Sequence, residues 1–114
     1  MNFTLSKEDN LGIFHLHEPR LDSTNSADVK SELLILSQEP IDVLIVDLGE
    51  ITFCDSSGLS ALLLAERQMR ERGGGLVLVD ANGKVKNLIE IAKLMNIIPV
   101  FPSIALAKEA LEER

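Results

Sequence analysis

The chain has 114 residues, a formal net charge of −7 and a single cysteine, Cys54. A chain of this length suits one domain, and no apolar run approaches the roughly 18 residues needed to cross a bilayer. One cysteine forms neither an internal disulfide nor a thiolate metal site, and an acidic chain lacks the basic surface that nucleic acid requires. The N-terminal residues also lack the pattern of a secretory signal. We therefore expect a single soluble domain over residues 1–114, in the cytoplasm.

The chain opens with the pattern of a β-hairpin followed by a helix. Residues 3–7 and 11–16 predict two short strands, and Glu8-Asp9-Asn10 between them supplies turn-forming side chains. Beyond residues 22–25, any of which can cap a helix, apolar residues at helical spacing predict an amphipathic helix. These apolar residues are Val29, Leu33 and Leu36. The helix should end before Pro40.

The middle of the chain predicts a buried strand and a second helix. The run Val43 to Leu48 is apolar apart from Asp47 and too short for a helix, which is typical of a central strand buried on both faces. A helix should then extend from Ser57 to Arg72, with Gly73-Gly74-Gly75 ending it. Residues 76–79 predict the next buried strand.

The last third continues the alternation of helices and strands. After a turn at residues 80–83, an apolar stripe predicts a helix that contains Val85, Leu88, Ile89, Ala92 and Met95. Residues 97–101 predict a short strand, and residues 104–113 a terminal helix capped by Ser103. The whole pattern predicts an α/β fold: a single, mostly parallel sheet with an antiparallel N-terminal hairpin and about four helices.

The most informative segment is Asp55-Ser56-Ser57-Gly58-Leu59, which follows the central strand and opens the second helix. Backbone N–H groups at a helix start lack partners and carry partial positive charge, so they can hold a serine oxygen or a phosphate upon it. Gly58 allows a bulky group or another backbone to come close. The residues alone leave two interpretations open: a serine that only caps the helix, with Asp55 as a first-turn acid, or a phosphorylated switch.

Together with other parts of the chain, this segment resembles the STAS family, which is shared by sulphate transporters and anti-sigma factor antagonists. The resemblance spans nearly all 114 residues. It rests on the hairpin, on Leu21-Asp22, on the apolar strand from Val43 to Leu48, and on the segments 53–59 and 74–79. It implies a STAS-like fold and a regulator without catalytic activity.

The resemblance also implies roles for individual residues. In anti-sigma factor antagonists of the family, the serine directly after the aspartate is phosphorylated by the partner, which is both anti-sigma factor and kinase. The acceptor here would be Ser56, exposed to its kinase, with Ser57 as the alternative. Asp55 would shape the turn, Ser57 would cap the helix, and Asp22 would lie beside the site. The segment 18–22 departs from the Gly-Glu-Leu-Asp-like turn of the family, which affects the shape of the partner surface.

The function that the resemblance implies is a phosphorylation-controlled protein-protein switch. The chain would bind an anti-sigma factor/serine kinase while Ser56 is unphosphorylated, freeing a sigma factor, and a cognate phosphatase would reset it. Leu59 and Leu64 are expected to contact the partner, and we expect a monomer or weak dimer. The alternative is a non-catalytic STAS scaffold subunit of a membrane lipid or anion transport system, in which the serine is only a cap.

Other residues with chemical potential favour structural roles. His15 and His17 alternate along a predicted strand and so share one face, but no third metal ligand is evident near them, and we expect no metal. Cys54 is expected to be a small buried thiol. Neither a histidine that could activate Ser56 nor a phosphate-binding loop is apparent, so we expect neither an enzyme nor a cofactor.

Overall fold

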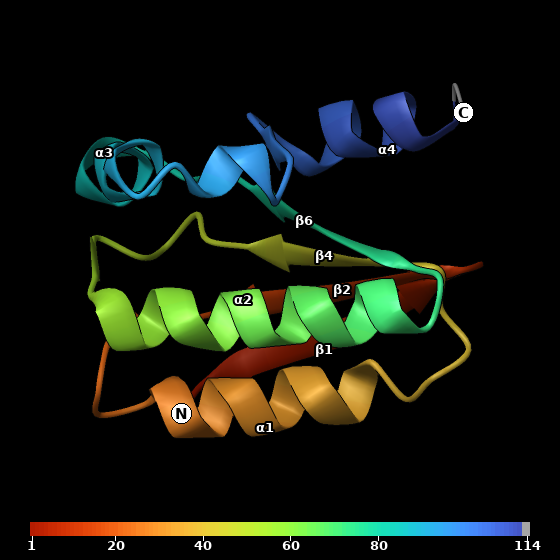
Figure 1. Cartoon of the computed structure of the whole chain (residues 1–114), viewed down its shortest axis with the longest axis horizontal. Coiled ribbons are helices and arrows are strands. Elements are labelled where there is room, and N and C mark those ends of the chain that lie inside the picture. The colour runs from red at the N-terminus through yellow and green to blue at the C-terminus, as the bar shows by residue number, and fades with distance from the viewer. Residues whose placement is uncertain (113–114) are drawn as a thin grey trace.

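A computed structural model describes residues 1–112 of the chain and shows an α/β fold (Figure 1). The main sheet has five strands in the order β1-β2-β4-β6-β7. These are β1 (Phe3–Glu8), β2 (Leu11–Leu16), β4 (Val43–Asp47), β6 (Gly75–Val79) and β7 (Val100–Phe101). The first two strands pair antiparallel and all later pairs are parallel. The predicted fold class is confirmed.

Helices connect the parallel strands, and a last helix follows β7. They are α1 (Ser26–Leu36), α2 (Ser56–Glu71), α3 (Gly83–Ile91), the short 3-10 helix η1 (Leu94–Asn96) and α4 (Ile104–Glu112). Figure 1 shows α1 and α2 lying side by side against the sheet. The predicted last residue of the terminal helix, Glu113, lies outside the described residues. Within residues 1–112, no helix is both long and apolar enough to cross a membrane.

Strand β4 occupies the centre of the core, and all five of its residues are buried. Its side chains alternate between the two faces of the sheet. Leu44 and Val46 pack in the larger cluster with α1, α2 and α3, whereas Val43 and Ile45 pack in the smaller cluster with α4. The apolar run therefore reflects two covered faces, as predicted.

The third long helix is shorter than its apolar stripe predicts. Val85 and Ile89 are buried, but α3 ends at Ile91, and both Ala92 and Met95 are exposed. The chain leaves the helix at Lys93, whose left-handed backbone (φ 57°) begins a 3-10 turn. The predicted strand over residues 97–101 is likewise reduced to β7.

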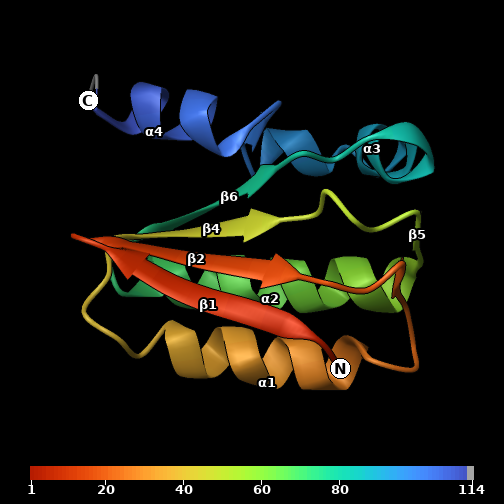
Figure 2. The ribbon, with the colours of Figure 1, turned by 180° about the vertical axis from the view of Figure 1, so that it is seen from behind.

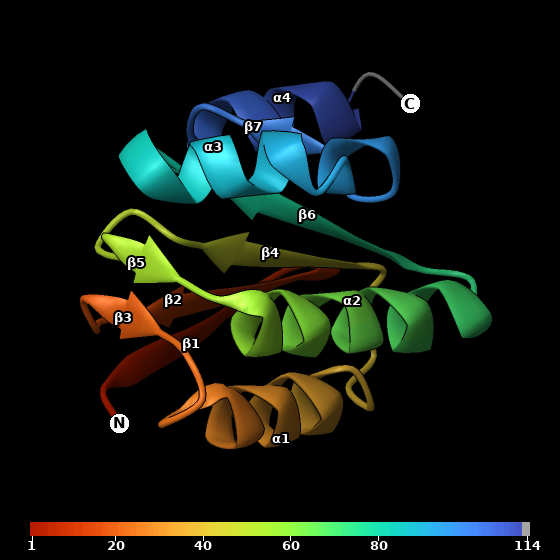
Figure 3. The same cartoon turned by 60° about the vertical axis from the view of Figure 1, so that its left-hand side comes forward.

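A second, two-stranded sheet lies outside the main one and was not predicted. Strand β3 (Arg20–Leu21) pairs parallel with β5 (Phe53–Cys54), so that Leu21 lies opposite Cys54. Figure 3 shows the two short strands side by side near the start of α2. This pairing joins the segment that follows β2 to the segment that follows β4.

Candidate functional site

The start of α2 is held against β3 by backbone contacts. The Asp55 N–H donates to the carbonyl oxygen of Leu21 at 3.2 Å, which continues the β3–β5 pairing into the helix start. A Cβ atom added to Gly58 would lie 2.6 Å from that carbonyl oxygen and 2.9 Å from Cys54 Sγ. Only glycine fits so close an approach, as the sequence predicted for this position.

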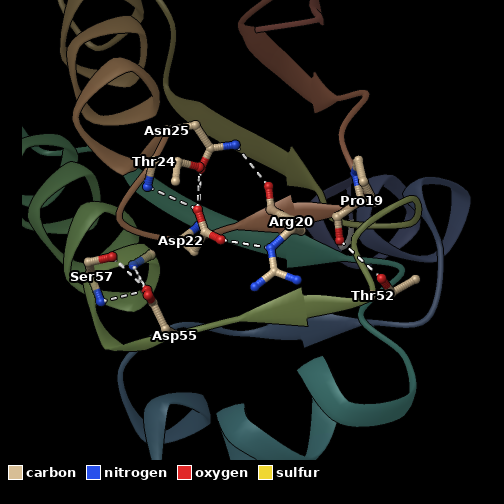
Figure 4. Close-up of polar contacts among 9 residues, drawn as sticks. Pro19, Arg20, Asp22, Thr24, Asn25, Thr52, Asp55 and Ser57 are labelled. Atoms are coloured by element: carbon tan, nitrogen blue, oxygen red, sulfur yellow. Dashed lines mark hydrogen bonds and ion pairs between the residues drawn. The ribbon is translucent and has the colours of Figure 1, made fainter.

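Asp55 caps helix α2. One of its carboxylate oxygens, Oδ1, accepts hydrogen bonds from the Ser57 N–H (3.0 Å), the Gly58 N–H (3.1 Å) and the Ser57 hydroxyl (2.5 Å), as Figure 4 shows. These bonds, led by that of the Ser57 hydroxyl, hold the pKa of Asp55 below its ordinary value. The prediction that Ser57 is the cap is wrong, because the Asp55 carboxylate accepts the hydrogen bonds of the free N–H groups of Ser57 and Gly58.

Ser56 and Ser57 occupy different environments. Ser56 is the first residue of α2 and is exposed, as expected, and its hydroxyl makes no hydrogen bond to any residue in the range 1–112. Ser57 is half-buried and donates its hydroxyl to Asp55. Of the two adjacent hydroxyls, only that of Ser56 is both accessible and free.

Asp22 lies at the end of β3 and is 6% exposed. Its Oδ1 accepts from the Thr24 N–H (3.0 Å) and hydroxyl (2.5 Å), and its Oδ2 from Arg20 Nε (2.8 Å) (Figure 4). The Thr24 hydroxyl and then Arg20 are the main causes that lower the pKa of Asp22 to about 2. The backbone N–H of Ser23 is near enough to the Asp55 carboxylate to contribute to its lowered pKa. Asp22 therefore borders the candidate site, and both carboxylates are ionised at neutral pH.

The surface beside this turn carries an aromatic ring and a cation that sequence reasoning missed. The Arg20 guanidinium lies over the ring of Phe53, 4.2 Å from its centroid, because the two residues are register partners in β3 and β5. Phe53 is 38% exposed. Two-residue strands carry no periodic signal, so nothing in the sequence indicated that these side chains meet.

Comparison with known proteins shows to which family the chain belongs. The sequence model of the STAS domain matches residues 2–107. The chain belongs to the STAS domain family. BtrV of Bordetella bronchiseptica, named as a candidate anti-sigma factor antagonist, is 30% identical over 112 residues, covering 98% of this chain and 96% of BtrV. The anti-sigma-B factor antagonist of Listeria monocytogenes is 32% identical over 92 residues, covering 81% of this chain and 79% of its own. The resemblance inferred from the sequence is confirmed.

Solved structures agree on the fold of this STAS domain. The anti-sigma factor antagonist SpoIIAA of Bacillus, in its unphosphorylated form, superposes with a TM-score of 0.82 at 16% identity, covering 99% of this chain and 98% of SpoIIAA. SpoIIAA in its phosphorylated form gives a TM-score of 0.73, covering 96% of this chain and 99% of that one. At this level of identity the likeness concerns the fold alone. BtrV and the Listeria protein are both named as anti-sigma factor antagonists.

The apolar residues of α2 that were expected to contact a partner have different positions in this STAS domain. Leu59 is 8% exposed and belongs to the main core, so the expectation for Leu59 is corrected: its side chain faces inward one turn into the helix. Leu64 is half-buried and lies two helical turns beyond Ser56, with exposed Ser60 between them. Spacing by four residues places all three on one face of α2.

Cys54 is a buried thiol, as predicted. It is 9% exposed, and burial, followed by the negative charges of Asp55 and Asp22, raises the pKa of its thiol to about 11. A thiol with so high a pKa is almost entirely protonated at neutral pH and is a poor nucleophile. The STAS domain therefore uses Cys54 for packing behind the turn.

His15 and His17 have an acidic neighbour that was not evident from the sequence. Glu50, in the loop after β4, places Oε2 at 2.8 Å from His15 Nε2 and 2.5 Å from His17 Nδ1. The expectation that no third potential ligand lies nearby is therefore wrong. Glu50 is far from the two histidines along the chain. It meets them because β2 and β4 are parallel neighbours whose carboxyl ends share one edge of the sheet.

Proposed function

We propose that this STAS domain is an anti-sigma factor antagonist whose binding to an anti-sigma factor is switched off by phosphorylation of Ser56. The observation that carries the proposal is the free, exposed hydroxyl of Ser56 at the first position of α2, directly after the capping Asp55. Support comes from the sequence relatives named as antagonists, and from SpoIIAA, which has a phosphorylated and an unphosphorylated form. The proposed partner is both anti-sigma factor and serine kinase, and a phosphatase reverses the modification. Regulators of transcription act in the cytoplasm, which is the compartment proposed here.

The electrostatics of the turn supports a switch that works through charge. A phosphate adds about −1.5 to −2 charges at neutral pH. Helix N-termini commonly hold phosphates through free N–H groups, but here Asp55 already occupies those of Ser57 and Gly58. A phosphate on Ser56 would therefore remain at the surface, near the ionised Asp55 and Asp22. It would repel an acidic partner surface and resist burial, without any need to refold the domain.

The partner surface proposed here is the outer face of the first three turns of α2, formed by Ser56, Ser60 and Leu64. Leu64 lines a shallow surface depression with Leu63 and Arg67, which gives this face apolar area and a positive charge. Leu59, which points into the core, is not part of it. A phosphate on Ser56 would stand at one end of this face, where it would disturb any interface that covers the helix.

Native lysate that contains the partner provides the test. Tag-free wild type, Ser56→Ala and Ser57→Ala are incubated with lysate and ATP, and their intact masses are measured. We expect the mass of one phosphate on wild type and Ser57→Ala and none on Ser56→Ala. Phosphate retained by Ser56→Ala, or absent from wild type, would contradict the assignment.

Partner affinity provides the second half of the test. Ser56→Ala should retain the captured partner, whereas Ser56→Asp should bind it more weakly because of charge and desolvation. Equal affinity of wild type, Ser56→Ala and Ser56→Asp for the captured partner would contradict the proposed switch. Capture of a membrane transport subunit in place of a kinase would favour the scaffold alternative.

A further inference from the structure

We propose that His15, His17 and Glu50 bind a single Zn²⁺ ion. The site lies at the carboxyl end of β2, beside the loop that follows β4, and Figure 2 shows the ends of these neighbouring strands at one edge of the sheet. It is separate from the phosphorylation switch, and the proposal does not depend on the proposed function.

The three potential ligand atoms converge on one point. His15 Nε2, His17 Nδ1 and a Glu50 carboxylate oxygen all lie within 4.8 Å of one another. The histidines alternate along the strand direction, so their rings share one face and stack with centroids 4.1 Å apart. Glu50 is brought opposite them by the pairing of β2 with β4, in which His15 is the register partner of Asp47.

The other nitrogen of each imidazole ring also faces a polar group. His15 Nδ1 faces Oδ2 of the buried Asp47 at 3.5 Å, and the other oxygen of Asp47 accepts from the Gly49 N–H at 2.8 Å. His17 Nε2 lies 3.0 Å from the Thr4 hydroxyl. Protein histidines that bind metals are usually oriented in this way, with the distal N–H directed to a carboxylate, carbonyl or hydroxyl group. Glu50 Oε2 accepts the hydrogen bond of His17 Nδ1 in the metal-free chain, so metal binding would displace a proton from this nitrogen and use its lone pair.

One ligand atom lacks a hydrogen-bond partner. Among the side chains described, the buried His15 Nε2 atom makes no hydrogen bond, and its contact with the Glu50 carboxylate oxygen at 2.8 Å is that of an ion pair. Buried polar atoms are normally satisfied by protein, water or an ion. A cation between the three ligand atoms would satisfy this nitrogen and separate it from the carboxylate.

The ligand chemistry favours zinc over harder cations. Zn²⁺ combines imidazole nitrogen with carboxylate oxygen, often with two histidines and one glutamate and an open fourth position, whereas Mg²⁺ and Ca²⁺ prefer oxygen ligands throughout. Two further acids add negative charge here, because Asp47 and Asp80 both border Gly49. Bound zinc would connect strand β2 to the loop that leads into β5.

Calorimetric titration of the tag-free chain with ZnCl₂ tests the proposal. We expect one ion per chain for wild type. Glu50→Gln and His17→Ala should weaken binding by at least about 100-fold, and Asp47→Asn, which releases the His15 ring, by about 10- to 100-fold. Glu39→Gln is the matched acid control, because Glu39 is exposed and pairs with Lys7 outside the cluster, and its affinity should equal that of wild type.

Cobalt substitution distinguishes this site from adventitious binding. Co²⁺ titrated into wild type and into Cys54→Ser should give the same visible spectrum, because the buried thiol takes no part. Melting curves without metal verify that each variant is folded. The proposal is overturned if wild type binds no zinc, if Glu50→Gln and His17→Ala keep wild-type affinity, or if Cys54→Ser alone abolishes the cobalt spectrum.

Discussion

At the scale of single residues, neighbouring side chains at the start of α2 have different roles. Asp55 satisfies the helix N–H groups, Ser57 fixes Asp55, and Ser56 is left with no structural task. The motif indicated which residues matter. It could not indicate which oxygen caps the helix, because aspartate and serine have similar preferences for that position and the outcome depends on where the first helical turn begins.

Removal of the cap should destabilise the domain far more than removal of the Ser56 hydroxyl. Asp55→Ala leaves two N–H groups without a partner and should lower the Tm by roughly 2–10 °C, whereas Ser56→Ala should leave it nearly unchanged. Asp55→Asn, which retains a capping oxygen, is the control and should recover most of the loss. Thermal melts followed by circular dichroism measure all three. If Ser56→Ala lowered the Tm as much as Asp55→Ala does, Ser56 would have a capping role.

Asp22 should make stability depend on acid pH. Its pKa is about 2 in the folded chain against an ordinary 3.8, so the unfolded chain takes up this proton more readily. The stabilisation is complete above the unfolded value and is lost as the pH falls through about 2. Urea unfolding of wild type and Asp22→Asn, measured from pH 6 downward, gives the free energy of unfolding of each. The difference between the two free energies should narrow below about pH 4. A difference that stays constant across this range would contradict the assignment.

At the scale of elements, the long periodic segments were predictable and the short pairings were not. Helices α1 and α2 and strands β4 and β6 carry clear apolar patterns, because each buries a whole stripe or two faces. The β3–β5 pair is set by long-range backbone contacts that no local pattern encodes. The candidate zinc site was missed for the same reason: Glu50 meets the histidines only after two distant strands have paired.

The close approach of β3 to α2 predicts a glycine requirement. Gly58→Ala would place a methyl group against the Leu21 carbonyl and should cost about 1–3 kcal/mol of unfolding free energy, or force α2 away from β3. Gly75→Ala is the control, because an added Cβ there meets no atom within 4 Å. Chemical denaturation should show a loss for the first variant and little change for the second. Equal stability of wild type and Gly58→Ala would mean that α2 can move away from β3 without any loss of unfolding free energy.

At the scale of the whole molecule, the sheet is covered unequally. Helices α1, α2 and α3 contribute to one large core, whereas α4 covers the opposite face with a small cluster around Ala107. Several large apolar side chains stay exposed around the end of α3 and the following turn: Ile91, Met95 and Ile97. The sequence placed Met95 on the apolar stripe of a helix, but the stripe continues past the point at which the helix ends.

We expect a monomer or a weak dimer in solution. The exposed apolar residues near η1 offer limited area for self-association, and the net charge of −7 opposes it. Sedimentation at increasing concentration should show a monomer with at most weak dimerisation, and Ile91→Lys should abolish any dimer that uses this surface. A tight oligomer that does not dissociate on dilution would contradict this expectation.

The hydrogen bonds that join β3 and β5 lie between two loops, so we expect the segment that carries the candidate switch to open locally. The N–H groups of Thr52 and Phe53 both donate to the Pro19 carbonyl, which also accepts the Thr52 hydroxyl, and Asp55 donates to Leu21. These bonds cross between two loops and can break together while the main sheet remains paired. Amide hydrogen exchange should therefore detect a local opening at Thr52, Phe53 and Asp55, faster than exchange in β4. Such an opening would let Ser56 adapt to the active site of a modifying enzyme at a fraction of the free energy of global unfolding.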